Sequence, residues 1–319
     1  MARVPVTPEP VSDVLGLGCV AIDDLLYVES YPPPDIKIPI LRHDRQCGGL
    51  TATALVAASR LGSACAYAGV LGDDELSDYA IQRLKQERVD LTHLVRRPEV
   101  RPVHSVIVVD TTRQTRTIFY DLYGVVGADA AWPPAAVIRS TRVLFVDYVG
   151  MEGMLRASQI AREAGIPVVA DLEDDRSPFF ARLFGLIDHL IVSRDFAARL
   201  TGASDPAAAA IRLWTPERRV VAVTCGADGC WYLTRAHHGV PQHQPAYPVE
   251  TVDTTGCGDV FHGAYASALA RGVEVAERVR FASAAAALKA TQPGGQAGIP
   301  TRPVVEGFLK SVTSDEETP

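Results

Sequence analysis

The middle of the chain alternates short, entirely apolar runs with segments of helical spacing. Strands that alternate with helices and are apolar on both faces are typical of a parallel sheet covered by helices on both sides. The apolar runs lie at 14–20, 64–70, 143–147, 167–171, 186–192 and 220–224. The helical segments lie at 51–60, 75–88, 153–164, 194–200, 206–213, 259–271, 274–291 and 303–312. We therefore expect an α/β fold with a central, mostly parallel, Rossmann-like sheet.

Two regions break this alternation and predict half-buried strands in hairpins. The first hairpin pairs residues 25–29 with 36–41, and the second pairs 103–109 with 115–120 through a turn at 110–114. Alternating apolar and polar positions are typical of strands with one face in solvent. The prediction is a small antiparallel lid, built from about 25–41 and 103–120, beside the parallel core. An edge extension of the main sheet is the alternative.

Length and charge narrow the class of protein. The chain has 319 residues and a net charge of −7, which allows a sizeable core and disfavours binding to nucleic-acid phosphates. The early apolar run is too short to span a bilayer and has no basic flank, so we expect no membrane segment and a cytoplasmic protein. The six cysteines form no C-x-x-C pair, which favours reduced thiols. We expect one domain over 13–312, between loose tails at 1–12 and 313–319.

The segment VDTTGCGD at 252–259 carries the clearest chemistry. It stands between an expected strand at 247–252 and the helix that begins near Asp259. Small residues at 256–258 let backbone N–H groups approach a ligand closely, and the N-terminus of a helix favours an anion. Asp259 has the right chemistry to accept a proton from a hydroxyl nucleophile. The alternative is an ordinary helix start with an acid in its first turn. The chain contains no G-x-x-x-x-G-K-[ST], which excludes a Walker-type site.

This segment is part of a longer pattern. The string DTTGCGDVFHGAYASALARG, from Asp253, resembles the signature D-T-x-G-A-G-D-x-F-x-G-A of the ribokinase (PfkB) family of carbohydrate kinases. The similarity extends back to Gly16 and forward through 281–289 and 291–300, and it is closest to ketohexokinases, fructokinases and sulfofructose kinases. The resemblance implies a ribokinase-like fold. It also implies ATP-dependent transfer of the γ-phosphate of MgATP to a primary hydroxyl of a ketose or related sugar.

The resemblance also implies roles for single residues around this segment. Asp259 would be the catalytic base, and the backbone of Gly256, Cys257 and Gly258 would form the anion hole. A monovalent cation, K⁺, would lie beside it; the residues implied to hold it are Asp253, Thr255, Lys289, Gln292 and Gly294. The alternative for this set is a capped loop after a helix. Cys257 replaces the usual alanine, either as a thiol with a depressed pKa or simply as a small residue.

The nucleotide and sugar ends follow from the same resemblance. The nucleotide site would be lined by Thr224, Gly226, Gly229 and Ala287, with the small side chains of 284–287 forming an adenine pocket. The sugar would be bound by Asp23, Asp35, Gly48, Gly49 and Thr53. Leu50 and Thr53 stand where relatives often have asparagine, so the sugar is left unnamed. Lys37, His43 and Arg45 would either meet an anionic sugar or form a solvated basic face.

A last departure lies at 193–196, where Ser-Arg-Asp-Phe replaces the N-x-x-E motif that organises Mg²⁺ in many relatives. Arg194 and Asp195 would take over its phosphate and metal-water contacts, or else be helix-surface charges. Two rival functions remain at this point: a non-catalytic sugar or nucleotide sensor, and a nucleoside kinase on the same fold. A homodimer through the lid is plausible from the apolar residues Ile36, Ile38, Val106 and Val108.

Overall fold

The computed structural model describes residues 12–113 and 115–316. Residues 1–11 and 317–319 of the two expected tails lie outside this range. Ser12 already belongs to the first strand, and the last helix, α10 (Arg302–Glu316), runs into the segment expected to be a loose tail. Regular secondary structure therefore extends slightly past both expected bounds of the domain, 13 and 312.

An eight-stranded sheet forms the centre of the molecule, in the order β14-β13-β12-β11-β10-β9-β1-β4. Its parallel strands are the predicted ones, and neighbouring positions such as Leu15 and Leu144 lie side by side. They are β1 (Ser12–Leu17), β4 (Cys65–Tyr67), β9 (Thr141–Val146), β10 (Val168–Asp171), β11 (His189–Ser193) and β12 (Val220–Thr224). The run at 64–70 splits between β4 and β5 (Val70–Leu71), and β5 pairs with β6 (Val95–Arg96) in a separate small sheet.

One edge of the sheet differs from the prediction. Two antiparallel strands, β13 (Cys230–Thr234) and β14 (Gln242–Gln244), extend it, flanked by the short helices η1 (Gly226–Asp228) and η2 (Arg235–His237). The prediction of a strand at 247–252 was wrong: these residues have no regular secondary structure. Pro248 has no N–H to donate to a strand ladder, and the segment instead lines a cavity.

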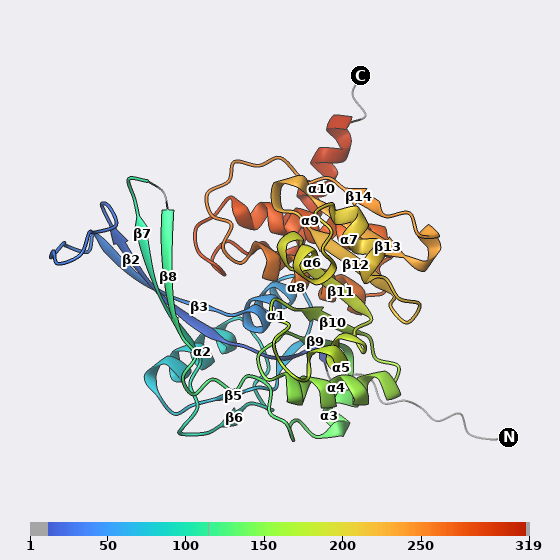
Figure 1. The fold of residues 1–319 in the computed structure, drawn as a ribbon, viewed down its shortest axis with the longest axis horizontal. Helices are drawn as coiled ribbons and strands as arrows, with labels where there is room; N and C mark the ends of the chain where they lie inside the picture. Colours follow the sequence, from blue (N-terminus) through green and yellow to red (C-terminus); the bar gives the residue numbers. More distant parts are fainter. Residues whose placement is uncertain (1–11, 114, 317–319) are drawn as a thin grey trace.

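Successive residues of each parallel strand point to opposite faces, and helices cover both (Figure 1). Val143 and Phe145 of β9 pack in one hydrophobic cluster, while Leu144 and Val146 pack in the other. The first face is covered by α1 (Leu50–Arg60), α2 (Glu75–Gln86), α8 (Cys257–Ala270), α9 (Val275–Ala290) and α10. The second is covered by α3 (Ala135–Arg139), α4 (Met151–Glu163), α5 (Phe180–Phe184), α6 (Arg194–Thr201) and α7 (Pro206–Leu213). The doubly covered sheet is confirmed.

A separate four-stranded sheet, which we call the lid, projects from one side of the body (Figure 1). Its order is β3-β2-β7-β8, from β2 (Ala21–Val28), β3 (Arg42–Gly48), β7 (Val103–Asp110) and β8 (Thr115–Asp121). Its outer pairs are antiparallel, whereas β2 and β7 run parallel. The prediction of a strand at 36–41 was wrong: these residues form an irregular loop, and strand pairing begins at Arg42. Prolines at 32–34 and 39 lack the N–H groups that a strand needs there.

No helix within the described residues combines the length and the apolar composition needed to cross a membrane.

Candidate active site

Acidic side chains gather where the parallel strands end, the edge at which α/β sheets bind ligands. Asp171 ends β10, and Asp259 stands in the first turn of α8. Burial raises the pKa of Asp259 well above its usual range, and the charges of Asp171 and the exposed Glu173 raise it further, although part of the Asp259 surface remains accessible. A carboxylate in such a place binds a proton more tightly than a free one, as a general base requires.

Asp147, directly after β9, plays a structural part in the same cluster. It is fully buried and accepts hydrogen bonds from Cys19 N at 2.6 Å, Thr51 Oγ1 at 2.7 Å and Val149 N at 2.7 Å. Burial raises its pKa to about 6, against the opposing effect of these donors. Asp147 thereby ties the end of β1 to the start of α1.

His262 lies one turn after Asp259 on α8 and has an acceptor at each ring nitrogen. Nδ1 is 2.8 Å from Gly258 O and 3.2 Å from Asp171 Oδ2, and Nε2 is 3.1 Å from Ile191 O. Burial lowers the pKa of His262, while the two carbonyl hydrogen bonds and the Asp259 charge oppose this effect. The ring thus lies between the backbone of residues 252–259, which we call the anion-hole segment, and Ile191 in the middle of β11.

Gly256 caps the helix that carries the base. It has a left-handed φ of 78°, and a Cβ there would lie 2.8 Å from Gly295 O. Only glycine fits this turn without displacing the neighbouring loop. The first-turn amides of a helix have no intrahelical partners and can therefore bind an anion. In α8, however, the Cys257 amide is already used, because Cys257 N donates to Thr254 O at 3.1 Å. A phosphoryl group would therefore meet the amides of Gly258 and Asp259 first, rather than the full predicted set at 256–258.

The Cys257 thiol is not activated by its place at a helix N-terminus. Burial raises its pKa, and Asp253 and Asp259 act in the same direction against the opposing charge of Lys289. A neutral thiol is a poor nucleophile, so this structure favours the interpretation of Cys257 as a small residue that fits.

The set of residues predicted to hold K⁺ does come together, but the oxygen atoms of Asp253 and the main-chain oxygen of Lys289 are already engaged by protein donors. Asp253 Oδ1 accepts from Thr255 N and Oδ2 from Gly294 N, each at 2.8 Å. Lys289 O accepts from Gln292 N at 3.1 Å, and Asp253 O accepts from the Lys289 ammonium at 2.8 Å. A potassium ion does not fit this arrangement, because a lysine side chain already donates to one of the oxygens.

The predicted nucleotide residues line one cavity of about 520 Å³, between the N-terminal end of α8 and the C-terminal half of α9. Thr224, Gly226, Gly229 and Ala287 all face it, and so do Cys257 and Gly258 of the anion-hole segment. Ala284 and Ala285 are instead buried in the core. The turn at 224–229, which we call the nucleotide turn, and the first turn of α8 therefore line the same cavity.

Arg194 ties α6 to this cavity wall. It donates to Cys225 O at 3.1 Å and forms an ion pair with Asp228 in the nucleotide turn. Phe196 is buried in the core, and Asp195 is exposed at the start of α6. Among these residues, only Arg194 and Asp195 remain near the surface to replace the missing motif.

On the lid side, Asp23 faces the glycine pair. A Cβ at Gly48 would lie 2.6 Å from Asp23 Oδ2, and one at Gly49, with a φ of 93°, would lie 2.7 Å from Ala21 N. Burial raises the pKa of Asp23, and Asp24 adds to this while Ser105 and His104 oppose it. The two glycines therefore let β3 and α1 approach β2 closely, which places Asp23 at the junction of lid and body.

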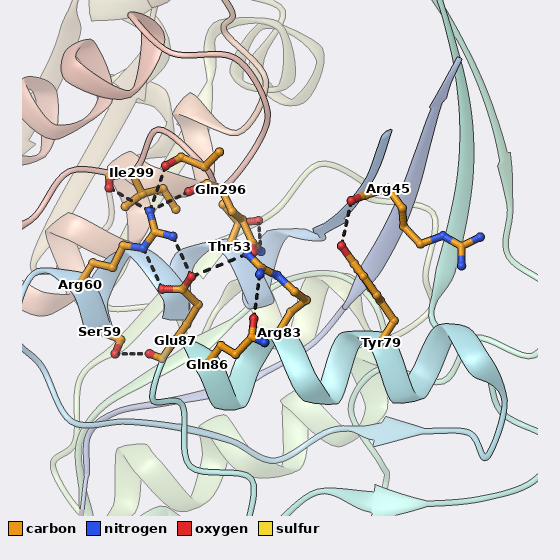
Figure 2. A network of polar contacts seen from close by, with 11 residues as sticks. Arg45, Thr53, Ser59, Arg60, Tyr79, Arg83, Gln86, Glu87, Gln296 and Ile299 are labelled. Atoms are coloured by element: carbon orange, nitrogen blue, oxygen red, sulfur yellow. Dashed lines mark hydrogen bonds and ion pairs between the residues drawn. The ribbon is translucent and has the colours of Figure 1, made fainter. Parts of the chain in front are cut away.

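Two predicted sugar contacts lie elsewhere. Thr53 is only 1% exposed, and its hydroxyl accepts from Gln296 Nε2 at 3.2 Å (Figure 2). Its position does not support a contact with sugar. Asp35 lies in the exposed loop between β2 and β3, whereas Asp23 stands near the opposite end of β2, at its start.

The basic residues of the lid are largely paired. Arg45 Nε lies 2.7 Å from Asp24 Oδ1, and its Nη1 lies 2.8 Å from Glu75 Oε1. His43 is 3.4 Å from Asp24. The Arg45 guanidinium holds the pKa of Asp24 well below its usual range. This supports the interpretation of a paired, solvated face over an anion-binding one.

The lid also contacts the anion-hole segment. Arg116 on β8 donates to Thr255 Oγ1 and lies 3.8 Å from Asp253 Oδ1. Gln46 on β3 accepts from Gly295 N at 3.1 Å. Two lid strands thus reach the two loops that meet at Gly256.

Comparison with known proteins identifies the family. A family model described as "pfkB family carbohydrate kinase" matches residues 14–302. The chain is 29% identical over 282 residues to Fructokinase-1 of Zea mays, covering 80% of this chain and 85% of that protein. It is 26% identical over 319 residues, 96% of its length, to a bifunctional ribokinase/ribose-5-phosphate isomerase A of Fructilactobacillus sanfranciscensis, and it spans 57% of that longer relative.

A solved structure has the same fold over nearly the whole chain. The putative ribokinase from Agrobacterium tumefaciens superposes with a TM-score of 0.87 at 28% identity, covering 94% of this chain and 98% of that one. The match extends across the lid, the sheet and the C-terminal helices. Family model, fold and site geometry agree, and the chain belongs to the pfkB family of carbohydrate kinases.

Proposed function

We propose that the protein transfers the γ-phosphoryl group of MgATP to a primary hydroxyl of a ketose or related sugar. One observation carries the proposal: the nucleotide turn at 224–229 lines the same cavity as Cys257 and Gly258, which directly precede Asp259 in the first turn of α8. A donor nucleotide in that cavity would present its terminal phosphate to the helix N-terminus, beside a carboxylate suited to be a base.

In this mechanism Asp259 accepts the proton of the sugar hydroxyl as its oxygen bonds to the γ-phosphorus, and the bond to the bridging oxygen of ADP breaks. The amides of the first helical turn and the guanidinium of Arg116 stabilise the charge on the transferred group. Mg²⁺, when bound, would neutralise charge on the nucleotide phosphates, and Asp195 would hold a water of its shell. Asp23, at the lid junction, would orient the sugar.

A coupled assay of ADP release tests the function directly. Purified protein with MgATP is offered ketoses, aldoses, anionic sugars and nucleosides. We expect ADP release that depends on a sugar and saturates with it. No turnover across the panel, together with tight sugar binding in calorimetry, would instead favour the sensor, and turnover with nucleosides alone would favour the nucleoside kinase.

The acid limb of the pH profile should move when Asp171 is neutralised. Asp259 acts as a base only when ionised, so kcat/KM should fall as the pH drops through its raised pKa. The charge of Asp171, whose own pKa is also raised by burial, raises the pKa of Asp259, so Asp171→Asn should lower the pKa of Asp259 and shift this limb to lower pH. The limb is measured from initial rates between about pH 5 and 9. Asp175→Asn changes an exposed aspartate in the connection between β10 and α5, and it should leave the acid limb where it is in the parent.

We further infer that two copies pair through the lid. Exposed apolar side chains concentrate on β8 and on the loop before β3. They are Ile36, Ile38, Ile40, Leu41, Ile118, Phe119, Tyr120, Leu122 and Tyr123. The predicted contributors Val106 and Val108 are half-buried instead. Such a patch favours association between two copies of the chain.

Light scattering of the eluted protein measures this association. Phe119→Asp should convert a dimer into a monomer, because it places a charge in the apolar patch. Val240→Asp changes an equally exposed apolar residue outside the lid and should leave the dimer intact. A monomeric parent protein would refute the inference.

A further inference from the structure

Lys289 is an unusual lysine. It stands in the last turn of α9, it is completely buried, and its Nζ donates to the main-chain oxygen of Asp253 at 2.8 Å. Lysine is almost never fully buried without a partner, because the ammonium loses its hydration. Burial lowers the pKa of Lys289 and the charge of Arg116 acts in the same direction, while Cys257, Asp253 and Asp259 oppose them. These three acidic groups offset part of the cost of burying the ammonium.

The position of this ammonium matters because two loops meet around it. Ala290 O accepts from Val252 N at 2.8 Å and from Asp253 N at 3.1 Å, which joins the end of α9 to the anion-hole segment. Gly294 N donates to Asp253, and Gly295 packs on Gly256. The carboxyl end of a helix also carries the negative pole of its dipole, so a cation is favourable here. Lys289 therefore links the turn that positions Gly256 to the helix behind it.

A second cation of the chain holds the far side of the same loop. Arg60 Nη1 donates to the carbonyl oxygens of Gln296 at 2.9 Å, Ala297 at 3.2 Å and Ile299 at 3.0 Å. Its other nitrogens bind Glu87 (Figure 2). The Arg60 guanidinium therefore binds carbonyl oxygens of the loop at 294–299. The Lys289 ammonium binds Asp253, which in turn binds Gly294 of the same loop. Both cations are side chains of the protein itself.

We propose that the Lys289 ammonium is a tethered monovalent cation, which holds the anion-hole segment in the place of a potassium ion and makes the protein independent of added K⁺. An ammonium and a potassium ion carry the same charge, and both bind carbonyl oxygens. The tether supplies the cation at no cost in binding from solution. Lys289 is a positioning residue, since it acts on the phosphoryl site through Asp253. The kinetic part of the proposal rests on the proposed sugar kinase activity.

The test compares K⁺ dependence in four proteins at constant ionic strength, with choline chloride replaced stepwise by KCl. Thermal midpoint and affinity for the magnesium complex of a non-hydrolysable ATP analogue are measured without sugar, and ADP release is measured with it. The parent protein and Lys310→Ala, which changes an exposed lysine of α10, should show no response to K⁺. Lys289→Ala should lose about tenfold in analogue affinity and recover it with K⁺, because the truncation frees an oxygen-lined space. Lys289→Met fills that space without charge and should lose affinity irrecoverably.

Distinct results would overturn the proposal. A parent protein whose thermal midpoint or analogue affinity rises with K⁺ would show that the ammonium does not replace the ion. A Lys289→Ala variant that equals the parent without K⁺ would show that no cation is needed. If Lys289→Ala does not fold in choline, its folding in KCl and the irrecoverable loss in Lys289→Met decide in favour. Because these readouts need no sugar, a failure of the sugar kinase assay alone would leave them intact.

Discussion

Asp259→Asn should lower kcat by about 10²–10⁴-fold, the usual contribution of a positioned general base. The amide has nearly the same shape as the carboxylate, so KM for ATP and sugar should change little. It cannot accept the proton of the attacking hydroxyl. Steady-state rates with the best sugar of the panel measure the effect. Turnover within about tenfold of the parent would refute Asp259 as the base.

Thermal stability separates this loss from misfolding. The raised pKa of Asp259 means that its charged form is destabilised by burial and by Asp171. Asparagine removes that charge, so the variant should melt at or above the parent temperature at neutral pH. The difference should shrink as the pH falls through the raised pKa, where the parent carboxyl is also neutral. Glu163→Gln, a 72% exposed carboxylate at the end of α4, should change neither rate nor melting.

The sequence was sufficient for the core because burial on both faces leaves a strong signal. Entirely apolar runs predicted all six parallel strands of the sheet, and helical spacing predicted α8, α9 and α10. The edge strand β14 was missed because it consists of polar residues, Gln-His-Gln, and the short apolar strand β13 (Cys230–Thr234) was also missed. In the lid, the apolar residues at 36–41 suggested a strand, but Pro39 among them and Pro32 to Pro34 before them lack the N–H groups for pairing.

The site was predictable where chemistry depends on backbone shape. Gly258 and the turn at 224–229 line one cavity. Asp171 was missed, although it ends an apolar run; carboxylates at such ends mark the ligand edge of a parallel sheet. Lys289 was predicted to bind K⁺ through its main-chain oxygen, not to act through its side chain. Its side-chain direction is a tertiary feature, set by how α9 packs on the loop at 253–258, and no local pattern encodes it.

Gly256→Ala should lower kcat by about 10²–10³-fold, the cost of misplacing a donor in an anion hole. Alanine at a φ of 78° is strained by about 1–3 kcal/mol, and its Cβ would lie 2.8 Å from Gly295 O. Relief of that contact must move either the helix start or the neighbouring loop. In both cases the first-turn amides lose their alignment with the phosphoryl group, while the nucleotide turn at 224–229 is untouched. The loss should therefore appear in kcat more than in nucleotide affinity.

Gly272 offers a matched control for backbone strain. It has a similar φ of 73°, but a Cβ added there meets nothing within 4 Å. Gly272→Ala should therefore destabilise the protein by the strain alone, seen in its melting temperature, and keep full turnover. If Gly256→Ala shows the same melting temperature as Gly272→Ala and also full turnover, the loop at 294–298 yields without moving the amides. In that case the phosphoryl group is held by other donors, and Arg116, which reaches Thr255 from the lid, becomes the principal candidate.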